Sequence, residues 1–184
     1  MKTNKLIQLS LTLFFVITTA CVSTTEDPSV TYEKWKKDNE DYFKNMKDSA
    51  SYRLCDIPVN RGGGSFYSKI IKKGDSLSIC PISTDTVLVN YRGIMLSGYI
   101  FDQTYIGQNP VSDFAATPRY FVVKKLIAGF SEALMQMKVG EFRRVVLPQD
   151  LCYGASGVSI IPPYSTLVFD IQLIAIGVRS SSLN

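Results

Sequence analysis

The sequence predicts an α+β fold in which a curved antiparallel β-sheet wraps around one short α-helix, with an N-terminal helical extension. Hydrophobic residues make up 46% and charged residues 20% of the 184 residues, a balance typical of a globular protein. Beyond residue 64 most apolar residues alternate with polar ones, as in half-buried antiparallel strands. Only one segment beyond that point has helical spacing. These observations predict one domain of modest size.

The first 20 residues have the pattern of a secretory signal peptide. Lys2 and Lys5 precede an apolar stretch that is shorter than the roughly 20 residues needed to cross a bilayer. The tetrad Thr18–Cys21 resembles a bacterial lipobox, with Thr where Leu is usual. We therefore expect Cys21 to carry a lipid, residues 21–31 to form a tether, and the protein to be anchored to a membrane of the bacterial cell envelope. Plain secretion is the alternative.

An amphipathic helix is predicted from Tyr32 to about Lys47, with the only Trp of the chain on its apolar side. Packing on its own domain is favoured over docking to a partner, because most amphipathic helices serve intramolecular cores. The run Gly62–Gly64 follows and suggests a flexible junction. We accordingly divide the chain into residues 32–64 (helix and junction), 65–179 (the main domain) and 180–184 (a tail).

Within the main domain, alternation predicts strands at residues 66–71, 87–92 and 166–178. The single helix is expected near residues 129–137, where Phe130, Ala133, Leu134 and Met137 share one face and Gly140 is placed to stop it.

Charge and composition exclude several classes of function. The net charge of +4 falls to +2 once Lys2 and Lys5 are removed, so nucleic acid is not an expected partner. The absence of His excludes imidazole catalysis and His-ligated metals, and no two Cys are spaced as CxxC. We expect no cofactor and no metal. Cys55 and Cys80 could pair, but three separate thiols besides Cys21 are equally plausible.

Six motifs follow one another in a recognisable order. They are VNYRG at 89–93, GYIFD at 98–102, Phe121 with LIAGF at 126–130, MKVGE at 137–141, LCYG at 151–154 and IPPYSTLVF at 161–169. In order and spacing this pattern resembles the FKBP-type peptidyl-prolyl cis-trans isomerases, the macrolide-binding immunophilins, over about residues 65–178. The resemblance implies isomerisation of X-Pro bonds in proline-containing polypeptides, with a macrolide as a possible further ligand.

The resemblance also implies where the site lies. An apolar cavity for the prolyl ring would be lined by Tyr91, Phe101, Leu126, Ile127, Phe130, Tyr153, Ile160, Ile161 and Phe169. Phe130 would be the floor, where the family usually has Trp. The carboxylate of Asp102 would accept a hydrogen bond at the edge, while the Tyr153 hydroxyl and the Ile127 backbone N–H would bind substrate carbonyls. Taken singly, each aromatic residue is more simply read as core, and the joint pattern carries the assignment.

Several departures from the family pattern bear on the site. The segment between Asp102 and Phe121 is long, so Tyr105 and Phe114 within it are candidates to extend or cover the groove. Arg119 stands where an aromatic residue is frequent, and we expect it to pair with Asp102. Cys152 replaces a usual Ala and is more simply a buried thiol than a redox switch.

The sequence leaves more than one function open. The favoured function is an envelope prolyl isomerase that assists the folding of exported proteins. The alternatives are a non-catalytic lipoprotein of the same fold that binds a proline-containing segment or partner protein, and a structural envelope lipoprotein that acts through the helix at 32–47. The residue preferred before proline, the client proteins and the oligomeric state stay open.

Overall fold

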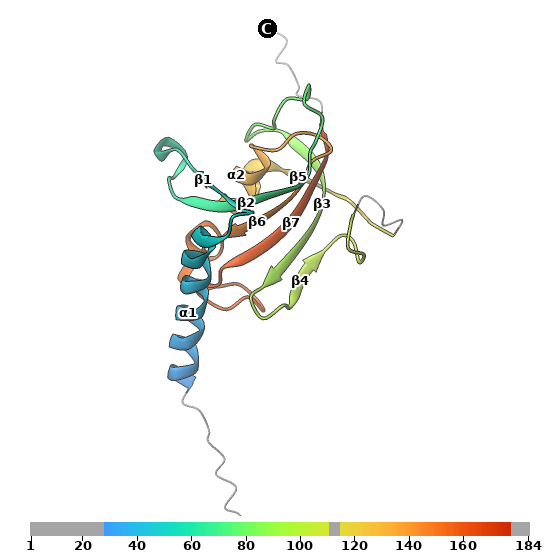
Figure 1. Cartoon of the computed structure of the whole chain (residues 1–184). Coiled ribbons are helices and arrows are strands. Elements are labelled where there is room, and N and C mark those ends of the chain that lie inside the picture. The colour runs from blue at the N-terminus through green and yellow to red at the C-terminus, as the bar shows by residue number, and fades with distance from the viewer. Residues whose placement is uncertain (1–27, 111–114, 178–184) are drawn as a thin grey trace, which may run out of the picture.

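The computed structural model describes residues 28–110 and 115–177, and it confirms the predicted fold class. Seven strands form one antiparallel sheet, and the short helix α2 (Ala128–Leu134) packs on one of its faces (Figure 1). The strands are β1 (Arg53–Asp56), β2 (Ser65–Lys72), β3 (Thr86–Met95), β4 (Ile100–Gln103), β5 (Arg119–Val122), β6 (Phe142–Leu147) and β7 (Leu167–Ile176).

The sheet has the order β1-β2-β6-β7-β3-β4, and β5 also pairs with β3. The strands β4 and β5 share one edge of β3, because β4 pairs with residues 92–94 and β5 with residues 86–89. The long strand β3 thus connects the two segments that flank the 103–118 loop. β4 and β5 therefore both lie beside β3, which also pairs along its length with β7.

Both faces of the sheet carry apolar residues, but in different amounts. The inner face packs against α2 in the main core, which includes Phe66, Leu134 and Ile171. The outer face has a smaller core in which Met46 packs with Val168. Because this second core covers the outer face, residues 167–171 of β7 are buried on both sides. Alternation in the sequence therefore understates the burial of β7.

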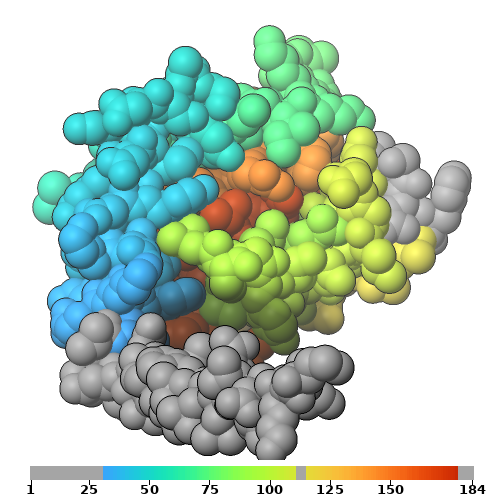
Figure 2. All heavy atoms as spheres, turned by 60° about the horizontal axis from the view of Figure 1, so that its bottom comes forward, coloured from blue at the N-terminus to red at the C-terminus, as the bar shows by residue number. Residues whose placement is uncertain are grey.

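The helix α1 (Pro28–Asn45) begins four residues before the predicted start and packs on its own domain, as expected. Trp35 lies against the main core, and Phe43 lies against the outer one. In Figure 2 this helix, in blue, borders a hollow whose floor is formed by late parts of the chain, in orange and red. No helix among the described residues is long and apolar enough to cross a membrane. The predicted signal peptide, Cys21 and the tail 180–184 lie outside the described residues.

The run of three glycines lies in the connection between two neighbouring strands of the sheet. Gly62, Gly63 and Gly64 connect β1 to β2 with φ angles of 108°, 71° and 96°, a region that L side chains rarely adopt. The expected flexible junction is thus a shaped turn between two paired strands. Sequence reasoning missed β1 because it is only four residues long and buries only Cys55. The division of the chain at residue 65 stays a prediction, and the sheet itself begins at Arg53.

The residues that directly follow β4 turn towards the outer face of the sheet. Tyr105 is 2% exposed, and the Arg92 guanidinium lies 4.3 Å from the centre of its ring. Arg92 also donates to the backbone carbonyls of Ile106 and Gly107, at 2.8 and 2.7 Å. Successive residues of a strand point to opposite faces, so Arg92 lies on the face opposite to Tyr91. The expectation that Tyr105 extends or covers the groove is therefore wrong, and Phe114 lies outside the described residues.

Tyr105→Phe is expected to stabilise the protein. The Tyr105 hydroxyl is buried and has no hydrogen-bond partner among the described residues. Its removal should raise the free energy of unfolding by about 1 kcal/mol, because an unsatisfied buried polar group costs that much or more. Burial also raises the pKa of Tyr105 from 10.0 to about 12. The unfolded chain therefore loses this proton first, and stability falls as the pH rises from 10 towards 12.

Urea denaturation of Tyr105→Phe at pH 7 and at pH 10.5 measures both effects. The variant should lose less stability than the wild type between the two pH values. Tyr99→Phe is the matched control, because Tyr99 is 54% exposed. A destabilised Tyr105→Phe variant would show that the hydroxyl has a partner.

Candidate functional site

Most of the predicted site residues line one cavity on the inner side of the sheet. Its volume is about 330 Å³. The lining comprises Tyr91, Phe101, Asp102, Phe121, Lys125, Leu126, Ile127, Phe130, Tyr153 and Phe169. Residues from four strands, one helix and two loops meet here, although they are separated by as many as 78 positions in the chain. Five of the six ordered motifs thus converge in space, and the MKVGE motif at 137–141 contributes no lining residue.

The cavity has an aromatic base. Phe130 on α2 is 4% exposed, and its ring lies edge-on to Phe169 of β7, with ring centres 5.2 Å apart. The Tyr91 and Phe130 rings are 5.9 Å apart and perpendicular. The Phe101 ring is also edge-on to the Phe169 ring, with ring centres 5.6 Å apart. Such edge-to-face contacts hold each ring in one orientation, so the cavity is preformed.

Gly93 makes room for one wall of this cavity. It lies on β3 opposite Phe169 of β7, and the Phe101 ring from β4 crosses directly over it. A Cβ atom on residue 93 would lie 2.6 Å from the Cε2 atom of Phe101, closer than real Cβ contacts occur. The glycine of the VNYRG motif is therefore required by the close approach of an aromatic ring, not by its backbone angles.

A polar group of three side chains forms the edge of the cavity. The Tyr91 hydroxyl donates a hydrogen bond to Oδ2 of Asp102. The Nη1 atom of Arg119 lies 3.0 Å from the Tyr91 oxygen and 3.4 Å from Oδ1 of Asp102. The expected pairing of Arg119 with Asp102 is confirmed. Because both side chains of this ion pair are about half exposed, it orients the carboxylate more than it stabilises the fold.

Burial keeps the two tyrosine hydroxyls of the site protonated. Desolvation raises the pKa of Tyr91 above its ordinary value, and the hydrogen bond to Asp102 raises it further. Desolvation likewise raises the pKa of Tyr153. Both phenols therefore remain hydrogen-bond donors throughout the physiological pH range.

Leu126 and Ile127 reach the cavity from the turn before α2. Ile127 directly precedes the helix, so its backbone N–H takes no part in the hydrogen bonds within α2. The structure does not bring the other two predicted isoleucines into the lining. Ile160 is 52% exposed, and Ile161 is 5% exposed within the main core. Ile161 also exchanges two backbone hydrogen bonds with Val158, which fixes this loop beside the cavity.

Two lining residues were not among the predicted site residues. Phe121 of β5 packs its ring 5.8 Å from that of Tyr91. It belongs to the ordered pattern, and its place in a strand paired with β3 gives it this position. Lys125 contributes an exposed positive charge at the rim. No motif singles it out, because a lysine before an apolar pair is ordinary surface sequence.

Neither Cys55 nor Cys152 offers a reactive nucleophile to this site. Cys55 and Cys152 are thiols and not disulfides. Burial raises the pKa of the Cys152 thiol strongly, so its reactive thiolate is disfavoured. This agrees with the simpler interpretation of Cys152 as a structural thiol, which is partly buried and packs against the main core. Among residues 28–110 and 115–177 no group of three or more Cys, Asp or Glu side chains could hold a metal ion.

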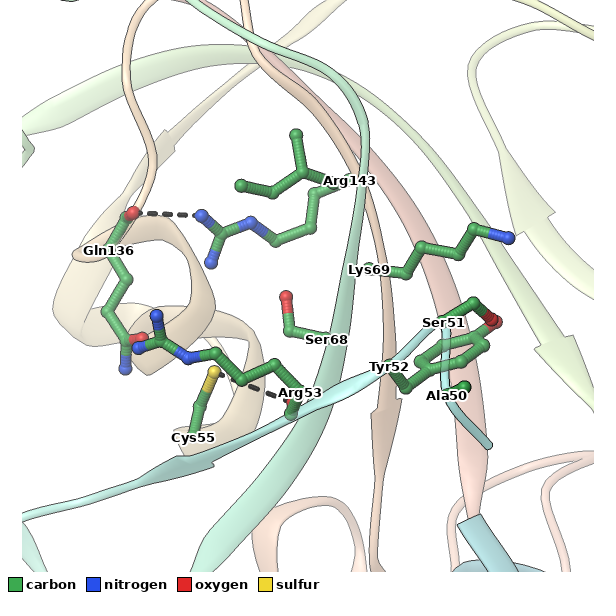
Figure 3. Close-up of a pocket in the computed structure, with 10 residues that line it drawn as sticks. Ala50, Ser51, Tyr52, Arg53, Cys55, Ser68, Lys69, Gln136 and Arg143 are labelled. Carbon is green, nitrogen blue, oxygen red and sulfur yellow. Dashed lines mark hydrogen bonds between the residues drawn. The ribbon is translucent and has the colours of Figure 1, made fainter. Parts of the chain in front are cut away.

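A different pocket of about 540 Å³ lies beyond the C-terminal end of α2 (Figure 3). Arg53, Ser68 and Arg143 line it, together with Gln136, whose carbonyl accepts a hydrogen bond from Arg143 at 3.0 Å. This pocket is larger than the aromatic cavity, but its lining is cationic and polar. An apolar ring is therefore accommodated better by the aromatic cavity, which is distinguished by its chemistry and not by its size.

The fold and the aromatic cavity together define an immunophilin-type domain. Residues 80–174 match the family model of the FKBP-type peptidyl-prolyl cis-trans isomerases. The chain belongs to this family.

Individual relatives agree with this assignment. The chain is 40% identical over 94 residues to the FKBP-type peptidyl-prolyl cis-trans isomerase FkpA of Escherichia coli K12. This alignment covers 51% of this chain and 32% of FkpA. It is 38% identical over 109 residues to the outer membrane protein MIP of Legionella longbeachae, covering 59% of this chain and 42% of MIP. The chain thus spans less than half the length of either relative.

A solved structure resembles most of the chain. The peptidyl-prolyl cis-trans isomerase of Pseudomonas syringae pv. tomato DC3000 superposes with a TM-score of 0.63 at 28% identity. The match covers 84% of this chain and 99% of that one. The likeness therefore includes more of the chain than the family model does.

Gly93→Ala is expected to damage the cavity while the sheet still forms. The added methyl group must displace the Phe101 ring, which costs about 1–3 kcal/mol of stability and removes one wall. Binding of a proline-containing peptide, measured by NMR titration, should weaken at least tenfold. Gly98→Ala is the control for a methyl group added away from the cavity, since no atom lies within 4 Å of its Cβ and any cost comes from the positive φ of residue 98 itself. Equal peptide affinity in Gly93→Ala and wild type would contradict this account of the wall.

Proposed function

We propose that this chain is a peptidyl-prolyl cis-trans isomerase that acts on proline-containing polypeptides of the bacterial cell envelope. The observation that carries the proposal is the preformed aromatic cavity of about 330 Å³ with a polar edge on one side. Its volume suits a prolyl ring with part of the preceding residue. Membership of the FKBP-type family and the isomerase names of relatives support the same activity.

The reaction needs a particular environment and no covalent chemistry. Rotation about an X-Pro bond must break amide resonance, with a barrier of about 18–20 kcal/mol. The twisted amide has lost much of the polarity of the planar one, so a dry apolar cavity stabilises it relative to the solvated ground state. The rings of Tyr91, Phe101, Phe130 and Phe169 would supply that cavity.

The polar groups would orient the peptide around the prolyl ring. The Tyr153 hydroxyl would donate to a substrate carbonyl, and the Ile127 N–H to a second one. Asp102, held by Tyr91 and Arg119, would present a carboxylate in one orientation at the cavity edge. None of these groups has to transfer a proton. Leu126 would close the apolar side, and the exposed Ile160 would contact chain that flanks the proline.

The decisive test is cis-trans exchange on a series of X-Pro peptides with the chain from residue 22 onwards. Wild type should accelerate exchange, and a macrolide immunophilin ligand should inhibit it. Asp102→Val and Phe130→Leu should each lower kcat/KM at least tenfold, which is about 1.4 kcal/mol of lost transition-state stabilisation. Asp56→Asn, a change at an exposed carboxylate of β1, should have no effect.

Absence of exchange in a folded wild type would overturn the enzymatic proposal. Peptide binding without exchange would instead identify a non-catalytic binding module. Phe130→Leu is preferred to alanine because it keeps most of the buried volume, so loss of activity is not confused with loss of folding.

We further propose that Cys21 is lipidated and anchors the protein to an envelope membrane. The basic, apolar and small-residue order of residues 1–20 supports this, as does similarity to a relative described as an outer membrane protein. With one anchored end, the tether and α1 would hold the prolyl site near the membrane surface. Clients would then be exported polypeptides during folding.

Cys21→Ser tests the anchor in the full-length chain expressed in a bacterium. The wild type should fractionate with membranes and have the mass of a lipidated N-terminus, whereas the variant should be released into the soluble fraction. Cys152→Ala controls for the loss of a thiol as such. A wild-type protein that is soluble and unmodified would refute the anchor and favour plain secretion.

A further inference from the structure

One face of α1 is directed at the segment 163–166, which lies between the cavity residues Tyr153 and Phe169 in the chain. Tyr32, Trp35 and Asn39 are spaced three and four residues apart, so they share one side of the helix. All three contact the segment 163–166, which lies about 130 positions later in the chain. Figure 2 shows the same proximity, since the blue helix lies directly beside late segments of the chain.

Hydrogen bonds make this contact specific. The Trp35 indole N–H donates to the carbonyl of Pro163 at 3.2 Å. Asn39 is 1% exposed, and its Oδ1 atom accepts the backbone N–H of Thr166 at 2.8 Å. The Thr166 hydroxyl donates in return to the Asn39 carbonyl at 2.9 Å, and Asn39 Nδ2 donates to the Trp35 carbonyl at 2.8 Å. Both polar atoms of the Asn39 amide are therefore engaged.

The same helix face holds a strained residue in place. Tyr164 has a φ of +59°, a left-handed conformation that costs a non-glycine residue about 1–2 kcal/mol. The Tyr32 ring meets the Tyr164 ring edge-on at 6.0 Å, and the Lys36 ammonium lies 4.7 Å from its centre. Strained backbone persists only where its surroundings determine it, and here α1 provides those surroundings.

The held segment is connected to the cavity at both ends. The Tyr164 N–H donates to the Gly154 carbonyl at 2.9 Å, and Gly154 directly follows the cavity residue Tyr153. Thr166 leads straight into β7, where Phe169 forms part of the aromatic base. None of the α1 residues lines the cavity itself. The segment 163–166 thus offers α1 a direct connection to Tyr153 and Phe169.

We propose that α1 is a positioning element of the prolyl site, in which Trp35 and Asn39 fix the segment 163–166 and thereby place Tyr153 and Phe169. The proposal rests on the proposed function for its catalytic consequence, but its structural consequence stands independently. A lost contact would release the strained turn at Tyr164, and Tyr153 and Phe169 would then sample several positions. Displacement of about 1 Å at a catalytic site can cost up to a hundredfold in rate.

The test uses the chain from residue 22 onwards with three single substitutions. Asn39→Ala removes the acceptor for Thr166, and Trp35→Phe removes the indole N–H while keeping an aromatic ring in the core. Lys37→Ala is the control, because Lys37 lies on the exposed side of the same helix and forms an ion pair with Asp41 of that helix. Measurements are made at 10 °C, and circular dichroism first verifies that each variant is folded.

The primary readout is NMR of the Tyr153 and Phe169 ring signals, and the second is kcat/KM for X-Pro peptides. Asn39→Ala and Trp35→Phe should broaden or shift both ring signals and lower kcat/KM about tenfold, while Lys37→Ala should match the wild type. Unchanged ring signals in both folded variants would overturn the proposal. If the wild type itself shows no exchange, the proposed function fails, and the ring signals still decide whether α1 positions the site.

Discussion

The register between β3 and β7 is the constraint on which the site depends. It sets Tyr91 opposite Ile171 and Gly93 opposite Phe169, so that the pocket residues of both strands face α2. A slip of one residue would turn Tyr91 to the outer face and bring the Arg92 charge inward. The apolar core excludes that alternative, because Val87, Val89 and Leu173 are fully buried on the same side. The packing that stabilises the sheet therefore also places the aromatic base of the cavity.

The cavity combines an apolar floor with a polar edge, and the polar side chains of that edge have hydrogen-bond partners. A phenol and a carboxylate at the boundary of an aromatic cluster would be costly to bury alone. Tyr91 and Asp102 satisfy each other, and Arg119 from β5 supplies the compensating charge. β5 pairs with the same edge of β3 as β4 does, and this pairing places Arg119 beside Asp102. Arg119 thus contributes to the polar edge, while Tyr105, which follows β4, packs on the opposite face.

The sequence predicted those strands in which an alternation of apolar and polar residues is visible. Alternation located β2, β3 and β7 because apolar and polar residues alternate along each of them in the sequence, and ordered motifs identified Tyr91, Phe101 and Phe130 as neighbours. It did not predict β1, where Leu54 points outward and only Cys55 is buried, so that no alternation is visible over four residues. Nor could it determine the side on which Tyr105 packs, which is set by long-range contacts of Arg92. Ile160 and Ile161 illustrate the same limit, since adjacent residues of one loop have opposite environments.

The contact between α1 and the segment 163–166 makes α1 part of the domain that carries the cavity. A domain cut at residue 65 would contain every residue of the cavity, yet it would leave the Thr166 N–H, which is buried against Asn39, without its acceptor. An unsatisfied buried donor costs about 1–3 kcal/mol, and the strained Tyr164 would lose the ring contacts that hold it. Both losses fall on the loop between Tyr153 and Phe169. The smallest unit in which both contacts are intact therefore includes α1, although α1 contributes no residue to the cavity itself.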